Sequence, residues 1–282
     1  MKRIIFFLLL QVSFLVCFAD EYRDPVSNVI YTYEPTGGRA EVKSGVYLMF
    51  DGGDNDVIAV PGSPDAKAEI IILDKFIVDE KEYIVDKIGS CAFLLKDNVV
   101  SVTIPSSVNT IGSEAFYGCA NLSNISLEEG LASIEALAFC DCTSLDAIIL
   151  PEGLKTIKSG AFKDTGLSSI TIPSTVQNIG DAVFFFSPIK TIISLIEEPF
   201  KVPQICQQQN EVTLRVPVGS KLKYETTSSW NQFLTIEEIQ PTAIVSPIQH
   251  QITSCFDLQG RKLLRAPQKG VYIQNRKKVA VK

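Results

Sequence analysis

Apolar residues return along the chain at a nearly fixed interval. Isoleucines recur at steps of 23, 23, 23 and 22 residues, and a phenylalanine follows each of them five residues later. The two columns are Ile88, Ile111, Ile134, Ile157 and Ile179, and Phe93, Phe116, Phe139, Phe162 and Phe184. A fixed period of about 20–50 residues is typical of a solenoid, whose repeats bury their apolar faces only against neighbouring repeats. The pattern predicts a stack of similar turns over residues 85–195.

Each repeat also carries an apolar triplet with the alternation of a strand. The four complete triplets are Val99, Val102, Ile104; Leu122, Ile125, Leu127; Leu145, Ile148, Leu150; and Leu167, Ile170, Ile172. A fifth copy, Ile189 and Ile192, ends on Ser194 where an apolar residue is expected. Alternating apolar and polar positions favour a half-buried strand. We therefore expect a β-rich solenoid of about five turns, with one parallel strand per turn and the strands about 4.8 Å apart.

The repeat resembles that of a known protein family. Residues 99–119 read VVSVTIPSSVNTIGSEAFYGC. This is similar to the unit L-x-x-I-x-I-P-x-x-V-x-x-I-G-x-x-A-F-x-G-C of BspA-like leucine-rich-repeat proteins of bacterial cell surfaces. The resemblance covers roughly residues 85–195, and Glu135 and Lys158 depart from it where the unit has glycine. It implies a leucine-rich-repeat fold and a role in adhesion or protein recognition, with host extracellular-matrix proteins or neighbouring cells as partners.

The flanks of the repeats are expected to cap the stack, because terminal repeats otherwise expose their core. In the N-terminal cap, residues 20–84, Gly37-Gly38 lies between two strand-like segments, and residues 76–78 and 83–85 form a second predicted hairpin. Residues 196–240 are the expected C-terminal cap. Trp230 is the one tryptophan of the chain and could serve as a ligand platform, but its spacing to Phe233 favours core packing.

The two ends of the chain carry export signals of different kinds. Residues 1–19 combine a basic start, an apolar run and Cys17-Phe18-Ala19, which predicts a secretory signal peptide cleaved before Asp20. Residues 241–282 hold eight Lys or Arg residues against one acidic residue. This basic β-tail is similar to the C-terminal sorting domains of the type IX secretion pathway. The resemblance implies contact with secretion machinery, then release or attachment at the outer surface; the alternative is a small β-module that only completes the fold.

Charge and cysteine content narrow the classes of partner. The chain has a net charge of −6 and its acidic body argues against nucleic-acid binding, which needs a basic face. Six cysteines follow the signal peptide, an even number that would suit disulfides in an exported protein. Cys119 and Cys142, however, occupy the same repeat position, which favours buried free thiols. A bridge between these two residues is the alternative.

Catalysis is not expected from this composition. The chain contains one histidine, His250, in a predicted linker, so neither a His-based nucleophile activation nor a His-rich zinc site can be assembled. Cys140-Asp141-Cys142 lacks the spacing of a zinc knuckle, and the acidic run at residues 51–56 does not match a calcium loop. We therefore expect no enzyme, no metal site and no cofactor, and no transmembrane segment apart from the cleaved signal.

The candidate binding surface is the outward face of the predicted strands. Its two columns are Ser101, Asn124, Ala147, Ser169 and Thr191, and Thr103, Ser126, Ile149, Thr171 and Ile193. Five strands would make a face about 19 Å wide and on the order of 300–400 Å² in area, below the roughly 800 Å² per partner of a standard interface. Binding by single copies should then be weak and depend on multivalent display. The alternative is that these columns only keep the sheet face soluble.

Two further expectations concern aromatic residues and competing functions. Phe185 and Phe186 form a second apolar patch, for which contact with the C-terminal cap is the favoured explanation. An outer-surface glycan-binding protein is the alternative function, but it needs exposed aromatic platforms, which the strand face lacks. A structural surface component is a further alternative, distinguished by self-association.

Overall fold

The computed structural model describes residues 20–23, 30–33, 39–43, 68–239, 255–256, 262–263, 270–274 and 277–281. The chain divides into two compact units, residues 1–238 and 239–282. The predicted signal peptide, the acidic run at 51–56 and His250 lie outside the described residues.

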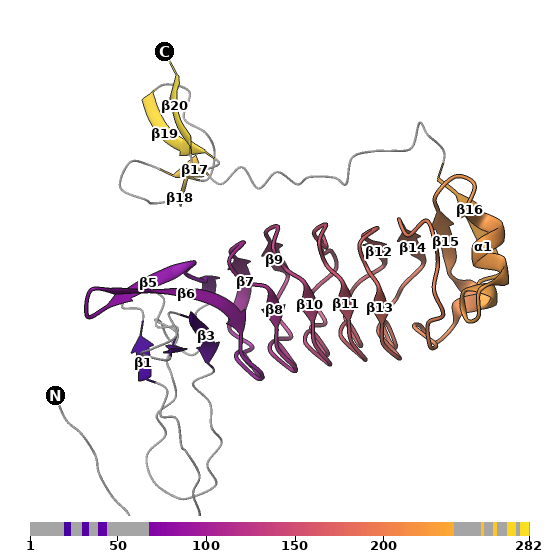
Figure 1. Cartoon of the computed structure of the whole chain (residues 1–282), viewed down its shortest axis with the longest axis horizontal. Helices are drawn as coiled ribbons and strands as arrows, with labels where there is room; N and C mark the ends of the chain where they lie inside the picture. The colour runs from indigo at the N-terminus through magenta and orange to yellow at the C-terminus, as the bar shows by residue number, and fades with distance from the viewer. Residues whose placement is uncertain are drawn as a thin grey trace, which may run out of the picture. The chain divides into compact units, whose positions relative to one another are not determined.

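The first unit is a parallel β-solenoid, as expected, with about seven turns instead of five (Figure 1). Each turn contributes to two rows of strands, where one row was expected. The first row runs through β1 (Asp20–Arg23), β2 (Ile30–Tyr33), β3 (Arg39–Lys43), β6 (Lys81–Ile88), β8 (Thr110–Ile111), β10 (Ser133–Ile134), β11 (Thr156–Ile157) and β13 (Asn178–Ile179), with β5 (Lys75–Val78) paired to β6. The second strand in each turn arises because the isoleucine columns of neighbouring turns also pair in parallel register.

The second row forms two sheets separated by one turn without an assigned strand. One sheet contains β4 (Ala68–Ile71), β7 (Val99–Ile104) and β9 (Asn124–Leu127). The other contains β12 (Ser169–Ile172), β14 (Thr191–Ser194), β15 (Thr213–Val216) and β16 (Thr235–Glu238). The two caps therefore extend the row at both ends: β4 comes from the N-terminal cap, and β15 and β16 come from the C-terminal cap.

The repeating phenylalanines form a stacked column through the core. Successive ring centroids lie 5.0, 5.2, 5.4 and 6.0 Å apart, with the first three pairs of rings within 2° of parallel. All five rings and all five repeat isoleucines are buried. Burying one such aromatic ring contributes on the order of 2–3 kcal/mol, so this column is a large part of what holds neighbouring turns together.

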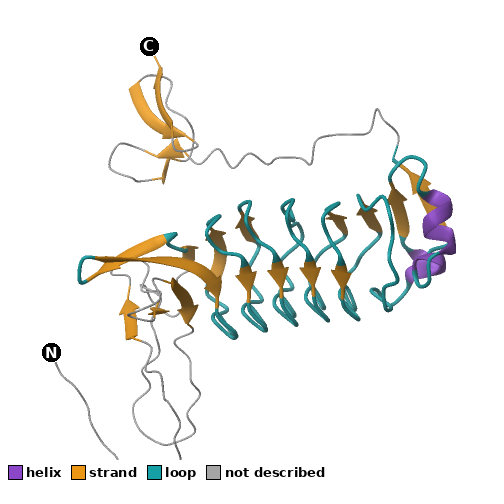
Figure 2. Ribbon diagram, in the orientation of Figure 1, coloured by secondary structure: helices purple, strands orange, loops and turns teal. Residues whose placement is uncertain are grey.

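A main-chain ladder joins the turns on the side where the phenylalanines enter the core. The amide of Phe116 donates to the carbonyl of Ala138 at 2.8 Å, and that of Phe139 donates to the carbonyl of Ala161 at 2.8 Å. Figure 2 draws these segments as loops, because they carry no strand assignment. The third residue after each repeat isoleucine adopts a left-handed backbone, yet only Gly160 among the five is a glycine. The ladder compensates a strain that costs about 1–3 kcal/mol per non-glycine residue.

Glu135 and Lys158, which stand where the repeat unit has glycine, form an ion pair with each other. At the equivalent Gly112, a Cβ atom would lie 2.7 Å from the main-chain nitrogen of Ser90, so the turns approach closely there. Glu135 and Lys158 occupy this position in adjacent turns, and Lys158 Nζ lies 2.6 Å from Glu135 Oε2. Burial alone would raise the pKa of the Glu135 carboxyl, but Lys158 and the Ser133 hydroxyl outweigh it and hold that pKa below its usual range. The main-chain bonds of Glu135 and Lys158 to the preceding turn, both 2.9 Å, match that of Gly112 at 2.8 Å, so the departures add an ion pair and leave the fold intact.

The cysteines of the repeat position are buried free thiols. Cys119 Sγ donates to the carbonyl of Phe93 at 3.0 Å, and Cys142 Sγ donates to that of Phe116 at 3.1 Å. All five cysteines within residues 68–239 are free, so the alternative of a Cys119–Cys142 bridge is not realised. Burial raises the pKa of Cys119 to about 12. These thiols act as small buried hydrogen-bond donors to the phenylalanine column.

A polar network at the C-terminal end explains why the last repeat departs from the apolar pattern. The buried Ser194 hydroxyl lies 2.6 Å from Tyr224 Oη, and Tyr224 donates to the carbonyl of Ile196 at 2.8 Å. Tyr224 lies on the short helix α1 (Lys221–Thr226), which packs against the 3-10 helix η2 (Trp230–Gln232). Trp230 is fully buried and donates to the carbonyl of Phe200 at 2.9 Å, so it packs in the core and offers no ligand platform.

The second unit is a small antiparallel sheet. Its strands follow the order β18 (Lys262–Leu263), β17 (Cys255–Phe256), β19 (Gly270–Gln274) and β20 (Lys277–Val281). The long pairing of β19 with β20 joins the Gly-Val-Tyr segment to the lysine-rich end of the chain. This tail is thus a β-module, and its sorting role stays a prediction.

The phenylalanine column gives a first prediction. The change Phe139→Ala should lower the free energy of unfolding by about 3–5 kcal/mol, because it leaves a cavity between two stacked rings. The control Leu222→Ala removes a side chain that is 71% exposed and should change it by no more than about 0.5 kcal/mol. Urea unfolding followed by circular dichroism measures both; equal effects would contradict a stability centred on the column.

The buried thiols give a second prediction. The pKa of Cys119 rises from 9.0 to about 12 on folding, so between these values the folded thiol keeps a proton that the unfolded thiol loses. Stability should therefore fall as the pH rises above 9, by up to about 1.4 kcal/mol per pH unit for this thiol. Cys119→Ser keeps the donor to Phe93 but does not ionise. Unfolding at pH 7.5 and 10.5 should show a shallower loss in the variant; identical losses would refute this assignment.

Candidate functional site

The predicted binding columns lie in register on the strands of the second row. Ser101 is aligned with Asn124, and Thr103 with Ser126, across β7 and β9. The same alignment joins Ser169 to Thr191 and Thr171 to Ile193 across β12 and β14. On β7, β12 and β14 they alternate with buried residues, and on β9 they alternate with the half-buried Ile125 and Leu127; each column residue on these strands is itself exposed or half-buried. The structure thus places them on one face, and ligand binding by that face stays a prediction.

This face, which we call the strand face, extends beyond the five predicted turns. At the N-terminal end Glu69 and Ile71 align with Ser101 and Thr103. At the C-terminal end the columns continue through Thr213 and Arg215 of β15, then Thr235 and Glu237 of β16. Eight rungs give a width of about 34 Å and, with strands roughly 15–20 Å long, an area on the order of 500–700 Å². The five-strand estimate was too small.

The extra rungs follow a spacing in the sequence that the five-turn interpretation did not use. Ile170, Ile192, Leu214 and Ile236 follow one another at a constant spacing of 22 residues. All four are buried in the structure. Pro217 also follows the last apolar residue of β15 in the same way as Pro173 follows that of β12. Residues 213–238 therefore belong to the stack as well as to the cap.

The strand face is interrupted at its centre. Residues 147–150 carry no strand assignment, and within residues 68–239 no main-chain hydrogen bond joins residues 146–150 to a neighbouring turn. The interruption coincides with the change in repeat length from 23 to 22 residues, between Leu145 and Leu167. Ile149 lies in it and is 48% exposed. The other predicted apolar position, Ile193, is half-buried, so Ile149 is the more exposed of the two; Ile71, at the N-terminal end of the face, is 57% exposed.

The C-terminal rungs add two charged residues to a face that also carries Glu69 at its N-terminal end. Arg215 Nε lies 3.4 Å from Glu237 Oε2, and both side chains are about half exposed at 50% and 51%. An exposed pair of this kind contributes little to stability. It places Arg215 directly beside Ile193 on the strand face, with Glu237 on the following rung.

The C-terminal cap does not cover the side chain of Phe186. Its side chain is 58% exposed, so the interpretation that the cap covers it was wrong. Phe185 is half-buried and makes an edge contact with Phe186 at a centroid distance of 6.2 Å. The ammonium of Lys163 lies 5.4 Å from the centre of the Phe186 ring. An exposed aromatic ring is therefore present, away from the strand face.

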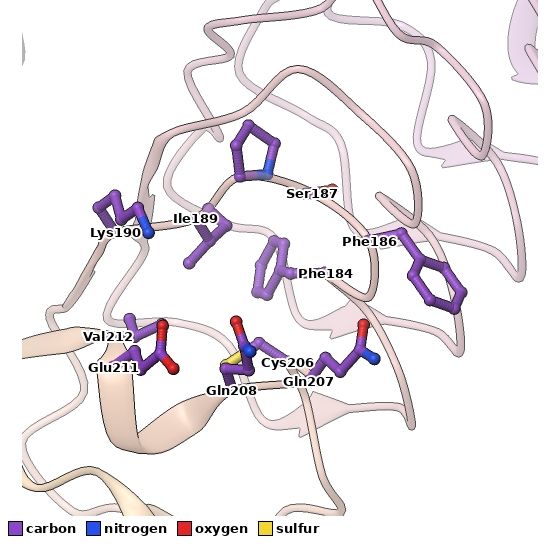
Figure 3. A pocket seen from close by; sticks show the side chains of 11 residues that line it. Phe184, Phe186, Ser187, Ile189, Lys190, Cys206, Gln207, Gln208, Glu211 and Val212 are labelled. Atoms are coloured by element: carbon purple, nitrogen blue, oxygen red, sulfur yellow. The ribbon is translucent and has the colours of Figure 1, made fainter.

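Two hollows lie near the C-terminal end of the first unit. The first, of about 260 Å³, opens between residues 184–190 and residues 206–212 (Figure 3). The second, of about 490 Å³, lies between residues 174–177 and residues 196–200. In the second hollow the carboxylate of Glu198 is engaged by the ammonium of Lys223. Among the described residues, no group of three or more His, Cys, Asp or Glu side chains could hold a metal ion.

Among the described residues, the cysteines with shifted pKa values offer no activated nucleophile, and burial lowers the pKa of the Lys96 ammonium. Burial, together with the nearby Glu114 carboxylate 3.9 Å from its sulfur, raises the pKa of Cys91. A raised pKa keeps the thiol protonated, whereas a nucleophilic cysteine needs a lowered one. Burial likewise raises the pKa of Cys206 and that of Tyr224 to about 12. Within the part of the chain that the structure covers, no helix is long and apolar enough to cross a bilayer.

The comparisons with known proteins agree with this architecture. Residues 74–192 match the BspA type leucine-rich repeat region in six copies. The leucine-rich repeat protein of T. pallidum is similar in structure, with a TM-score of 0.54 and 22% identity over 69% of this chain and 85% of that chain. A leucine-rich repeat protein of Bacteroides ovatus gives a TM-score of 0.48 and 18% identity over 81% of this chain and 68% of that chain. At these identities the likeness concerns the fold alone. No curated protein matches the sequence.

The interruption at the centre of the strand face gives a third prediction. Amides of residues 147–149 should exchange with solvent faster than the aligned amides of residues 191–193, since β14 is paired on both sides. Hydrogen exchange of the folded protein, resolved by residue, measures the difference. Equal protection of the two segments would mean that the ladder is continuous.

Proposed function

We propose that this protein is a secreted or surface-displayed leucine-rich-repeat protein that recognises a protein ligand through the strand face. The observation that carries the proposal is the strand face itself, with two outward columns in register over neighbouring strands. The match of residues 74–192 to the BspA type repeat region supports a role in recognition or adhesion. Extracellular-matrix proteins and neighbouring cells are the partners that we propose.

The composition of the strand face favours weak binding by each copy. Its area, on the order of 500–700 Å², is below the roughly 800 Å² per partner of a standard interface. Half of its side chains are small hydroxyls, and aromatic residues, which dominate the energetics of tight interfaces, are missing from both columns. Several copies acting together would raise the apparent affinity without any new contact. We therefore propose attachment by multivalent display.

Two features of the strand face would provide its anchors. Ile149 is exposed in the segment that lacks main-chain pairing, so its side chain and its free main-chain groups are available together. Ile193 is flanked by the Arg215–Glu237 pair, which offers both signs of charge. An apolar contact surrounded by polar groups is the usual anatomy of a protein interface.

Display at the surface would follow from the two terminal segments. We propose that residues 1–19 direct export and that residues 241–282 act as a sorting domain for the type IX secretion machinery. The pairing of β19 with β20 gives the tail a folded form that a sorting machinery could recognise. A structural surface component is the competing function, and it requires that the protein associates with itself at micromolar concentration.

The fourth prediction tests the strand face directly. The full chain, biotinylated and loaded on tetrameric streptavidin, should bind immobilised fibronectin, laminin or collagen, while the monomer binds much more weakly. The double change Ile149→Glu with Ile193→Glu should abolish binding of the tetramer, because it buries two charges in the contact. Biolayer interferometry measures both forms.

A matched control places two charges on the other row of strands. Thr110→Glu with Thr156→Glu should leave binding unchanged, because β8 and β11 do not contribute to the strand face. Binding lost equally in both double variants, or retained in both, would move the site away from the strand face. Failure of the tetramer to bind any of the three proteins, with self-association in its place, would favour the structural role.

A further inference from the structure

Phe186 occupies a turn position whose backbone is left-handed. Its φ angle is 64°, and the equivalent residues in the preceding turns are Leu95, Gly118, Asp141 and Asp164. A bulky residue in this conformation is strained, by about 1–3 kcal/mol, and such strain is concentrated at functional sites. The ring gains little burial in return, because it is 58% exposed. The ring makes an edge contact with Phe185 at 6.2 Å and has the Lys163 ammonium 5.4 Å from its centre, and the rest of its surface is open to solvent.

The turn ladder ends beside Phe186, and this opens the first hollow. In the preceding turns, the amides of Leu95, Gly118 and Asp141 donate to the next turn at 2.7, 2.8 and 3.0 Å. The amide of Asp164, in the following turn, donates likewise to the carbonyl of Phe185 at 2.8 Å. The turn after it, which holds Phe186, keeps the two earlier rungs, from Ala182 to Gln204 and from Phe184 to Ile205, both at 2.8 Å. Within residues 68–239 the amide of Phe186 has no such partner. By analogy with the preceding turns, this free donor faces the hollow between the diverging segments.

The hollow has an apolar floor and a polar rim (Figure 3). Phe184, Ile189, Cys206 and Val212 line it and are buried. At the rim, the amides of Gln207 and Gln208 make no side-chain hydrogen bond, and Lys190 and Glu211 make no ion pair, with any described residue. The polar groups needed to hold a small ligand are therefore present and unoccupied by the protein itself.

Both walls of the hollow are fixed before any ligand binds. On one side the Ser187 hydroxyl donates to the carbonyl of Phe162 at 2.9 Å and accepts from the amide of Thr165 at 3.0 Å. On the other side Gln204 Nε2 lies 3.3 Å from the carbonyls of both Cys206 and Gln207. Walls held in this way lower the entropic cost of binding.

We infer that this hollow binds one neutral hexose unit of a glycan, with Phe186 as the aromatic platform. A pyranose ring has an apolar C–H face suited to an aromatic ring, and hydroxyls that both donate and accept. The amides of Gln207 and Gln208 also both donate and accept, and the free amide of Phe186 adds a donor. A volume of about 260 Å³ is small for a drug-sized ligand but suits a single ring.

The chemistry of the lining disfavours other ligands. An anion would meet Glu211 as well as Lys190, so the rim offers no excess of positive charge. A fully apolar ligand would leave the amides of Gln207 and Gln208 desolvated without a partner, which is costly. The hollow lies on the turn side of the solenoid and shares no residue with the strand face, so this inference is independent of the proposed function.

Saturation-transfer difference NMR on the full chain tests the inference. The probes are methyl α-D-mannopyranoside, methyl β-D-galactopyranoside, methyl β-D-glucopyranoside and N-acetyl-D-glucosamine, each at millimolar concentration. At least one should receive saturation, and Phe186→Ala should weaken its binding about tenfold through loss of the aromatic contact. Phe186→Trp should retain binding.

Leu95→Ala is the matched control, because Leu95 holds the same turn position with a φ angle of 55° and is 59% exposed. It should leave the saccharide signal unchanged, as should Ile149→Glu with Ile193→Glu. If Phe186→Ala lowers the melting temperature markedly, Gln207→Ala with Gln208→Ala replaces it and should weaken binding likewise. Absence of a signal with all four saccharides, or a signal retained in the pocket variants, would overturn the inference.

Discussion

The close, regular spacing of neighbouring turns is the constraint on which the rest of this structure depends. Parallel main-chain pairing holds adjacent strands about 4.8 Å apart, and the phenylalanine rings, whose centroids lie 5.0–6.0 Å apart, fill the space that this spacing leaves. Every residue type that recurs in the sequence follows from it. Isoleucine fills the core under one row of strands, cysteine or a hydroxyl residue bonds a phenylalanine carbonyl, and glycine permits a close approach of the turns at Gly112.

The same constraint decides where this protein can interact with a partner. A regular stack presents flat columns of small side chains, as on the strand face, and these give area without deep pockets. Distinct features arise only where the regularity fails. The free main chain around Ile149 coincides with the change of repeat length, and the hollow beside Phe186 opens where the turn ladder loses its third rung. In a protein built from repeats, such local failures are the natural places for recognition.

Much of the fold could be predicted from the spacing of Ile111, Phe116 and their equivalents, because a period of 23 residues leaves few ways to bury both columns. The extra rungs at β15 and β16 were also predictable in principle, since Leu214 and Ile236 continue the 22-residue spacing. The exposure of Phe186 was not. It depends on the path of residues 204–212 after the ladder ends, and a sequence pattern holds no information on where an irregular loop leaves its neighbour. The buried partner of Ser194 was equally hidden, because Tyr224 lies 30 residues further along the chain.

The C-terminal end of the stack carries residues that disfavour the addition of a further turn. The column that begins with Ile104 and Leu127 continues as Ser194, Val216 and Glu238, so it becomes polar towards its end. Each polar member is satisfied: Ser194 by Tyr224, and the Glu238 carboxylate by the amide of Gly219 at 2.8 Å. Another turn could not bury Glu238 without losing this bond, and an unpaired buried carboxylate is far too costly. The sequence therefore ends the stack by making its continuation unfavourable, and the fully buried Trp230 closes the remaining apolar surface. The same device closes the end of the solenoid and leaves the outward faces of its strand rows, among them the strand face, as the regular surfaces of the first unit that are open to solvent.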